Sequence, residues 1–228
     1  MNYQLRESAD AVELAPAAAA TAAVIWLHGL GADGHDFVPI VPELRLPAAP
    51  AIRFLFPHAP IRGVTLNMGM RMRAWYDIKS LSSDNRADEA GLSESAARIA
   101  GLVDRERQCG IATNRIVVAG FSQGGAIAMH AALRYPEALA GVLLLSTYLP
   151  LSEALAAELA EANRRTPVWM GHGIYDPLLP VALGMAARDF LRAQGYAVEW
   201  KEYPMQHQVC QQEVTDIGKW LAGVLPGP

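Results

Sequence analysis

The 228-residue sequence contains little cysteine and no excess of basic residues. Its two cysteines, Cys109 and Cys210, form no C-x-x-C pair, so the chain has no disulfide framework of the kind that staples small secreted domains. With 19 Lys and Arg against 23 Asp and Glu, the formal net charge is -4. This balance argues against nucleic acid or an anionic membrane surface as the main partner and favours small molecules or neutral acyl groups.

The sequence also lacks an apolar run long enough to span a bilayer. Residues 15–27 are mostly apolar, but Pro16 interrupts the run and its length is too short for a membrane helix. Glu7, Asp10 and Glu13 leave no basic segment before it, which a signal peptide would have. We therefore expect a cytoplasmic protein with no stable membrane insertion.

Apolar residues make up 52% of the chain, which is enough for a core on both faces of a sheet. The length favours one domain over residues 1–228, with a frayed tail at 225–228. Short apolar runs rich in β-branched and aromatic residues predict strands. These runs are 24–27, 52–56, 115–119, 142–145, 168–170 and 198–203.

Helical patterns lie between several of these runs. The predicted helices are one with Leu92, Ala96, Ile99 and Val103 on one face, one with Ser152 as its N-cap that reaches Asn163, and one from Val181 to Gln194 before Gly195. Near-continuous apolar strands that alternate with helices predict an α/β fold. We expect a mostly parallel central sheet with helices on both faces.

Residues 57–85 differ from the rest, because proline, glycine, methionine and aromatic residues follow one another with no sustained period. This composition predicts a long loop or a short hairpin near the functional site. Its adaptable side chains, Met72 and Trp75 among them, are candidates to line an acyl pocket. Plain packing is the alternative interpretation.

Residues 120–124 match the pattern G-x-S-x-G, with Ser122 at its centre. The buried-strand run 116–119 precedes the match, and a helical segment opens at 124–129. This strand-turn-helix setting is what a nucleophile elbow requires. A serine that merely caps a helix is the alternative.

Two glycines flank the predicted nucleophile for a steric reason. Gly120 and Gly124 lie two residues before and two residues after Ser122, where side chains would crowd the strained turn. The turn also places the serine at a helix N-terminus, where the dipole and free N–H groups favour developing negative charge. The backbone N–H of Gln123 is therefore a predicted oxyanion donor.

A serine hydroxyl needs a base to take its proton, and histidine is the commonest choice. In α/β-hydrolases the order along the chain is Ser, acid, His, so only His130, His172 and His207 are candidates after Ser122. His130 lies inside the predicted nucleophile helix. His172 directly follows a strand and precedes every suitable acid in the sequence, so it does not fit the order. His207 follows the last strand and precedes the terminal helix, so we predict it as the base.

The orienting acid is predicted at Asp176, in a turn-rich loop after the strand 168–170. Asp189 is the other aspartate between the serine and His207, and it lies in the middle of a predicted helix. The carboxyl ends of parallel strands meet at one edge of a sheet, which would bring Asp176 and His207 together. An Asx turn before Pro177 is the alternative role for this aspartate.

Residues 29–34 fit the dinucleotide-binding pattern G-x-G-x-x-G after a strand. That fingerprint needs a helix at the third glycine, whereas Pro39 and Pro42 interrupt the segment after it, and no acidic residue ends the strand 52–56. The favoured alternative is an oxyanion loop, with the N–H of Leu30 as the second donor.

Six motifs together make the chain similar to the carboxylesterase and acyl-protein thioesterase family of small α/β-hydrolases, also described as lysophospholipase-like. They are L-H-G-L-G-A-D-G-H-D-F at 27–37, F-P-H-A-P at 56–60, R-A-W-Y-D at 73–77, G-F-S-Q-G-G-A at 120–126, G-H-G-I-Y-D-P at 171–177 and Y-P-M-Q-H at 203–207. The resemblance implies a lidless α/β-hydrolase fold with no cofactor and no metal. It also implies the triad Ser122, Asp176 and His207 with the oxyanion donors Leu30 and Gln123.

The resemblance is to the bacterial carboxylesterase branch, which implies a homodimer as one option. After the acid, Leu178-Leu179-Pro180 replaces the more usual valine-rich string, so Leu178 and Leu179 are expected in the pocket lining. The sequence thus predicts a serine hydrolase for carboxylic esters, with acyl thioesters and lysophospholipids as further candidate substrates. A dinucleotide-dependent oxidoreductase and a catalytically silent binding protein are the rival classes.

Overall fold

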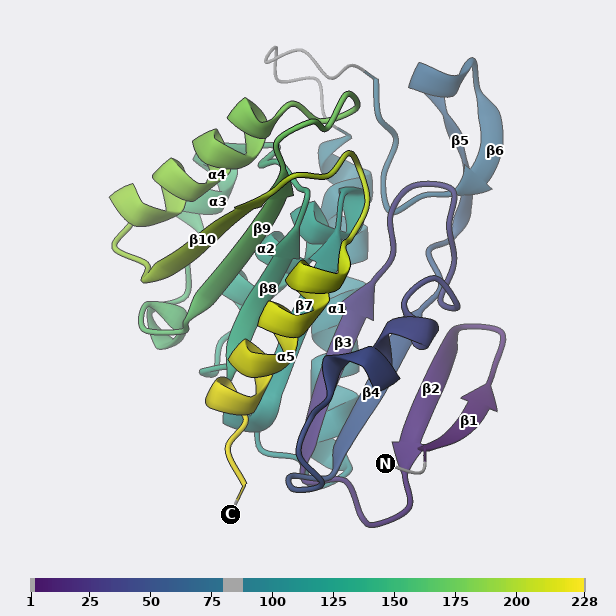
Figure 1. Ribbon diagram of the computed structural model, residues 1–228. Coiled ribbons are helices and arrows are strands. Elements are labelled where there is room, and N and C mark those ends of the chain that lie inside the picture. The colour runs from purple at the N-terminus through teal and green to yellow at the C-terminus, as the bar shows by residue number, and fades with distance from the viewer. Residues whose placement is uncertain (1–2, 80–87, 228) are drawn as a thin grey trace.

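One eight-stranded sheet forms the centre of the computed structural model, which describes residues 3–79 and 88–227 (Figure 1). The strand order is β1-β2-β4-β3-β7-β8-β9-β10, with every pair from β4 to β10 parallel and the β1–β2 and β2–β4 pairs antiparallel. The strands are β1 (Tyr3–Glu7), β2 (Ala11–Pro16), β3 (Ala22–Leu27), β4 (Ile52–Pro57), β7 (Ile116–Phe121), β8 (Gly141–Leu145), β9 (Val168–Gly173) and β10 (Val198–Tyr203).

The predicted strands are all present, with small differences at their ends. The antiparallel edge formed by β1 and β2 was not predicted. The structure divides the apolar run 15–27 at Pro16, where β2 ends, and β3 begins at Ala22. A proline has no N–H for a sheet ladder, so a strand commonly ends or bends there.

Helices cover both faces of the sheet, as predicted. Figure 1 shows α5 and the 3-10 segment η1 in front of the sheet, with α1 and α2 behind it. The side chains of β3 alternate accordingly: Ile25 and Leu27 pack with the α1 and α2 layer, whereas Val24 and Trp26 pack with α5 and η1. The helices are α1 (Glu89–Gln108), α2 (Gln123–Arg134), α3 (Ser152–Ala157), α4 (Val181–Ala193), α5 (Gln211–Val224) and the 3-10 segments η1 (Val38–Leu44), η2 (Thr65–Asn67), η3 (Thr113–Arg115) and η4 (Glu161–Asn163).

The nucleophile helix and the terminal helix are present as α2 and α5, and two of the three helices predicted from their residue patterns are confirmed. The four residues of the predicted apolar face of α1 are buried, and α4 ends just before Gly195, whose φ is +86°. The third prediction was wrong at both ends, because the N-cap is Leu151 rather than Ser152 and α3 stops at Ala157. The N–H of Ala160 donates instead to the carbonyl of Leu133, and the side chain of Asn163 accepts from the N–H of Leu139. These contacts with other elements replace the helical ladder.

The segment predicted as a long loop or short hairpin contains a hairpin. Strands β5 (Ile61–Val64) and β6 (Met70–Arg73) pair antiparallel, and η2 connects them. The end of the predicted segment, residues 80–85, lies outside the described residues.

The C-terminal tail is less frayed than predicted. Leu225 is fully buried beside α5, and the carbonyl of Pro226 accepts a 2.8 Å hydrogen bond from Arg115 Nη1. Apolar burial and this bond hold the start of the tail. Pro228 lies outside the described residues. Across residues 3–79 and 88–227, no helix is both long enough and apolar enough to cross a membrane.

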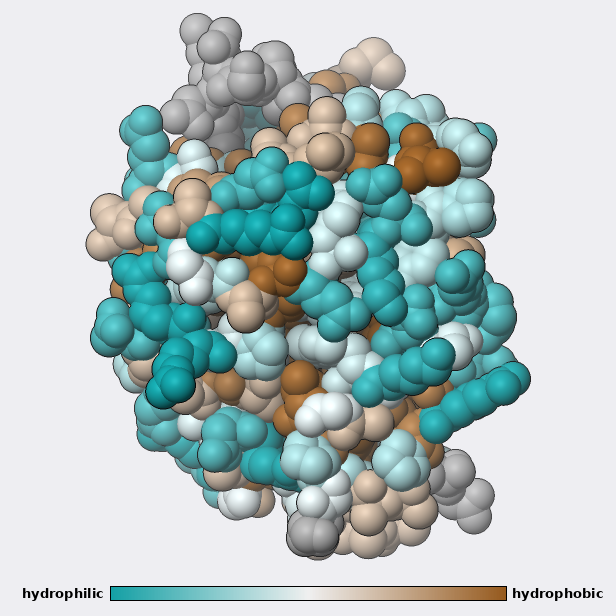
Figure 2. All heavy atoms as spheres, turned by 60° about the vertical axis from the view of Figure 1, so that its left-hand side comes forward, coloured by the Kyte–Doolittle hydropathy of each residue, from teal (hydrophilic) through white to brown (hydrophobic). Residues whose placement is uncertain are grey.

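The free edge of the sheet at β10 is polar. Figure 2 brings the α4 and β10 side of the molecule forward and shows hydrophilic residues with scattered apolar ones between them. Glu199 and Glu202 are exposed on β10, and the guanidinium of Arg188 on α4 lies 5.1 Å from the ring centroid of Trp200. Charges on an edge strand oppose pairing with another sheet.

Candidate active site

Ser122 occupies a strained turn between β7 and α2. Its φ of 54° and ψ of -121° are unusual for a residue with a side chain. A Cβ on Gly120 would lie 2.3 Å from the carbonyl oxygen of Gly124, and a Cβ on Gly124 would lie 2.4 Å from that of His28. Both glycines are therefore required by close backbone contacts, as the motif predicted.

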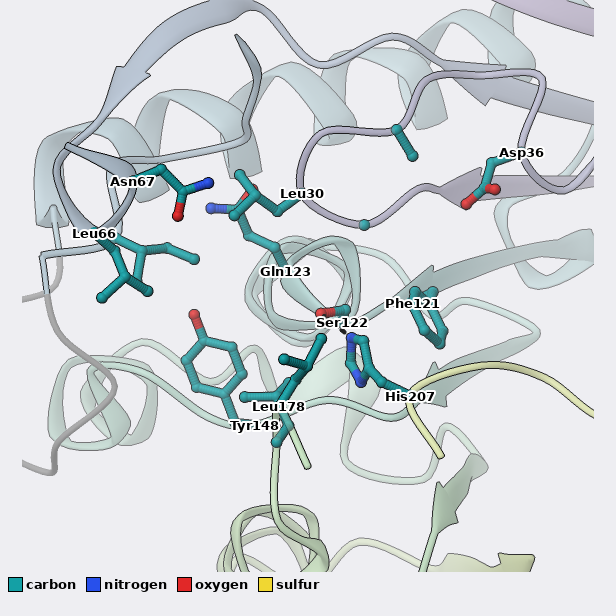
Figure 3. A pocket seen from close by; sticks show the side chains of 14 residues that line it. Leu30, Asp36, Leu66, Asn67, Phe121, Ser122, Gln123, Tyr148, Leu178 and His207 are labelled. Carbon is teal, nitrogen blue, oxygen red and sulfur yellow. Dashed lines mark hydrogen bonds between the residues drawn. The ribbon is translucent and has the colours of Figure 1, made fainter. Parts of the chain in front are cut away.

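The three predicted triad side chains form a continuous hydrogen-bonded chain (Figure 3). His207 Nε2 lies 2.9 Å from Ser122 Oγ, and His207 Nδ1 lies 2.6 Å from Asp176 Oδ2. With a proton on Nδ1 donated to the carboxylate, Nε2 is left as an acceptor for the serine hydroxyl. This arrangement allows proton transfer from the serine to the imidazole.

The carboxylate of Asp176 accepts hydrogen bonds within a turn and also contacts His207. Its Oδ1 accepts hydrogen bonds from the N–H groups of Leu178 and Leu179, at 2.9 and 2.8 Å, while Oδ2 faces His207. One buried carboxylate thus closes the Asx turn and contacts the imidazole. The turn holds Oδ2 in place toward the imidazole.

The two other histidines that follow Ser122 have structural partners. His130 Nε2 lies 2.8 Å from the carbonyl oxygen of Pro150, and burial lowers the pKa of His130 to about 4. His172 Nε2 lies 2.9 Å from the carbonyl oxygen of Leu179, and burial lowers its pKa as well. Neither contacts the serine hydroxyl. His172 lies within β9 and braces the loop that carries Asp176.

The glycine-rich loop after β3 presents Leu30 to the site. His28 supports this loop, since its Nδ1 lies 2.7 Å from the carbonyl oxygen of Gly29 and its Nε2 accepts from the N–H of Ala59 at 3.0 Å. Burial lowers the pKa of His28 to about 4, so the ring is neutral at pH 7. Within the described residues, the N–H groups of Leu30 and Gln123 donate to no other protein group.

The third glycine of the loop does not open a helix. A Cβ on Gly34 would lie 2.4 Å from the carbonyl oxygen of Phe56, and the N–H of Gly34 donates to His58 Nδ1 at 3.0 Å. A 3-10 segment with Pro42 inside begins at Val38. The loop therefore lacks the helix N-terminus that holds the pyrophosphate of a dinucleotide.

The fold and this geometry agree with comparisons to known proteins. The model of the phospholipase/carboxylesterase family matches residues 9–225. The chain belongs to this family. It is 40% identical to acyl-protein thioesterase 1 of Neurospora crassa, over 93% of this chain and 91% of that protein. It is 37% identical to acyl-protein thioesterase 1 of Cryptococcus neoformans, over 94% and 97%.

Solved structures show the same fold. The crystal structure of SOBER1 from Arabidopsis thaliana superposes with a TM-score of 0.84 at 31% identity, covering 90% of this chain and 99% of that one. The protein is thus a hydrolase with the α/β-hydrolase fold, as its sequence predicted. Membership in a carboxylesterase family disfavours the oxidoreductase interpretation.

In this family member, the side chain of Gln123 joins the nucleophile helix to the segment after β6. Its Oε1 accepts from the N–H of Trp75 at 2.9 Å, and its Nε2 donates to the carbonyl oxygen of Tyr76 at 2.8 Å. Trp75 Nε1 in turn donates to the carbonyl oxygen of His28 at 2.9 Å. These bonds connect the two segments that carry the free N–H groups. The sequence had predicted a role only for the backbone N–H of Gln123.

A cavity of about 350 Å³ opens at the serine. Leu178 and Leu179 line it, as expected from the sequence. Met72 and Trp75 do not: Trp75 is fully buried, and Met72 Sδ lies 3.5 Å from Asn67 Nδ2. The lining residues are Gly29, Leu30, Ala32, Asp36, Leu66, Asn67, Ile78, Phe121, Ser122, Gln123, Tyr148, Leu178, Leu179 and His207.

Several of these lining residues could not be predicted from the sequence, because they come singly from separate loops. Tyr148 follows β8, and its hydroxyl lies 2.5 Å from the hydroxyl of Tyr76. Burial raises the pKa of Tyr76 well above its ordinary value, so the Tyr76 hydroxyl stays protonated. Leu66 comes from the hairpin connection, and its N–H donates to the carbonyl of Ile78 at 2.8 Å. No local pattern in the sequence marks such residues.

Proposed function

We propose that the protein hydrolyses carboxylic esters and acyl thioesters by two-step acyl transfer. In the first step His207 takes the proton of Ser122 as Oγ attacks the carbonyl carbon, and Asp176 stabilises the imidazolium that forms. The observation that carries the proposal is the continuous chain of hydrogen bonds from Asp176 through His207 to Ser122, at 2.6 and 2.9 Å.

The N–H groups of Leu30 and Gln123 are the proposed oxyanion donors. Both belong to residues that line the cavity at the serine, and neither is engaged by another protein group within the described residues. Donors held in place before the reaction stabilise the negative charge that develops on the carbonyl oxygen. The imidazolium then gives its proton to the departing alcohol or thiol.

The second step releases the acid. With the leaving group gone, His207 removes a proton from water, and the resulting hydroxide attacks the acyl-enzyme carbonyl. The proton returns to Ser122 Oγ as the serine leaves. No metal or cofactor takes part in the proposed steps.

The proposed acyl site is the apolar part of the cavity. Leu66, Ile78 and Leu178 supply aliphatic walls there, which suit a hydrocarbon chain. Two relatives are named acyl-protein thioesterase 1, which supports S-acylated proteins as one substrate group alongside simple esters and lysophospholipids.

The proposal is tested by covalent labelling and kinetics. We expect a fluorophosphonate probe to label the wild-type protein and to fail with Ser122→Ala. The same variant should lower kcat for p-nitrophenyl butyrate on the order of 10⁴-fold to 10⁶-fold, with an unchanged circular dichroism spectrum. Ser93→Ala, at an exposed position of α1, is the matched control and should behave as wild type. Undiminished labelling or turnover by Ser122→Ala would refute the proposal.

A further inference from the structure

The proposed reaction divides the cavity into an acyl side and a leaving-group side. In the tetrahedral intermediate the carbonyl oxygen must face the N–H groups of Leu30 and Gln123. The departing oxygen or sulfur must face His207 Nε2, because that atom delivers its proton. The acyl chain then extends away from the imidazole. Cavity-lining side chains on the His207 side of Ser122 therefore face the leaving group.

Figure 3 shows different side chains on the two sides of Ser122. Leu66, Asn67 and Tyr148 lie on the side away from the imidazole, whereas Phe121 and Asp36 lie on the side of His207. The ring centroids of Phe121 and His207 are 4.8 Å apart, which places the Phe121 ring directly against the base. Asp36 is the acidic side chain of this part of the lining.

Asp36 differs from the acidic residue nearest to it in sequence. Asp33 Oδ1 lies 3.1 Å from His35 Nδ1 and also accepts from the N–H of His35 at 2.8 Å, so its charge is engaged. Asp36 is exposed at the cavity rim and makes no side-chain hydrogen bond or ion pair with any residue in the described ranges. Partial loss of hydration and the charge of Asp33 raise the pKa of Asp36. Both effects disfavour the ionised carboxylate, and a cation beside it would offset them.

We infer that Asp36 makes the enzyme prefer esters and thioesters whose leaving group carries a positive charge close to the scissile bond. The inference rests on the proposed function, because it uses the position of His207 to identify the leaving-group side. Asp36 takes no part in bond making: the leaving alcohol or thiol departs with the proton from His207, and the carboxylate acts through charge alone.

The experiment compares two esters of equal size and shape. Butyrylcholine and 3,3-dimethylbutyl butyrate share the acyl group, and a neutral tert-butyl group replaces the trimethylammonium group in the second. We expect wild-type kcat/KM to favour butyrylcholine, and Asp36→Asn to lower the ratio of the two kcat/KM values about five-fold. Because the acyl half and the triad are common to both substrates, the ratio cancels any general effect of the substitution.

Ionic strength and a second variant provide the controls. Raising the salt concentration from about 0.02 M to about 0.5 M should reduce the wild-type ratio toward that of Asp36→Asn, because the screening length becomes shorter. Glu43→Gln removes the same charge from an exposed position of η1 outside the cavity lining, and it should leave the ratio at the wild-type value.

Three results would overturn the inference. These are a wild-type ratio near one, an unchanged ratio in Asp36→Asn, and an equal drop in Glu43→Gln, which would reveal an effect of net charge. In each of these cases the esters are still hydrolysed, so the proposed function stands. Failure of both esters and of p-nitrophenyl butyrate, with no fluorophosphonate labelling, would instead overturn the proposed function itself.

Discussion

Asp176 contacts His207 with one carboxylate oxygen only. Oδ2 lies 2.6 Å from His207 Nδ1, while Oδ1 is engaged by the N–H groups of Leu178 and Leu179. The turn therefore fixes the direction from which the imidazole is approached. A replacement that keeps the turn but not the charge would separate these two functions.

Asp176→Asn is expected to lower kcat on the order of 10⁴-fold, because an amide nitrogen facing Nδ1 favours the wrong tautomer of the imidazole. The amide oxygen can still accept from the turn, so the melting temperature should change little. Steady-state kinetics with p-nitrophenyl butyrate and a thermal melt measure the two effects. Asp189→Asn, on the exposed side of α4, is the matched control. Near-normal turnover by Asp176→Asn would contradict the orienting role.

Gly124→Ala is expected to lower both stability and activity. Its Cβ would lie 2.4 Å from the carbonyl oxygen of His28 and 2.7 Å from that of Leu27, and backbone atoms cannot move aside cheaply. Overpacking of this kind costs about 1–3 kcal/mol of unfolding free energy. Chemical denaturation measures it. Gly101→Ala in α1 has nothing within 4 Å of the added Cβ and should instead raise the stability by roughly 0.5–1 kcal/mol.

Gln123→Ala is expected to loosen the oxyanion region while keeping its N–H group. The change leaves the N–H of Trp75 and the carbonyl of Tyr76 without their partner, and each unpaired buried group costs about 1–3 kcal/mol. We expect a lower melting temperature together with a lower kcat. The exposed residue Gln212, in the first turn of α5, provides the control variant Gln212→Ala. A kcat and melting temperature equal to those of the control would show that the side chain is dispensable.

Glu213→Gln is expected to change how stability depends on pH. Glu213 is fully buried in α5 against β9, where a Cβ on Gly171 would lie 2.2 Å from Glu213 Oε1. Burial raises the pKa of Glu213 from 4.5 to about 8, so the folded protein holds a proton that the unfolded chain releases above about pH 4.5. Wild-type unfolding free energy should therefore fall between pH 4.5 and 8, by about 1.4 kcal/mol per pH unit from this group.

Chemical denaturation at pH 5, 6, 7 and 8 checks this slope. The difference between Glu213→Gln and wild type should grow in favour of the variant as the pH rises. Glu43→Gln, at an exposed position, should give a profile parallel to that of wild type. Parallel profiles for Glu213→Gln as well would show that the buried carboxyl does not hold its proton.

Local chemistry explains why much of the site was predictable. A serine with φ of 54° flanked by close backbone contacts needs glycine at 120 and 124, and these glycines stand in the sequence next to a buried strand. Asp176 and His207 each follow a strand, and the parallel sheet brings the ends of β9 and β10 to one edge. The order serine, acid, histidine along the chain then selected Asp176 and His207 among the other candidates.

Other features could not be read locally. The strand β2 (Ala11–Pro16) overlaps only the start of the apolar run 15–27 that contains β3, and α3 ends early because Ala160 and Asn163 bond to other elements. Met72 and Trp75 looked suitable for a pocket by residue type, yet Trp75 is fully buried and donates to the carbonyl of His28, just before the glycine-rich loop. A side chain's type does not say which of two surfaces of a loop it faces.

The amino-acid sequence by itself determined the fold class, the family, and the order and identity of the predicted nucleophile, acid and base. These depend on periodicity, turn sterics and motifs that a few neighbouring residues specify. Tertiary structure alone decided the side-chain bonds of Gln123, the cavity walls at Leu66 and Tyr148, and the place of Asp36 in the cavity lining, on the His207 side of Ser122. Those features arise where separate loops meet, and the meeting is set by packing across the sheet rather than by any one segment.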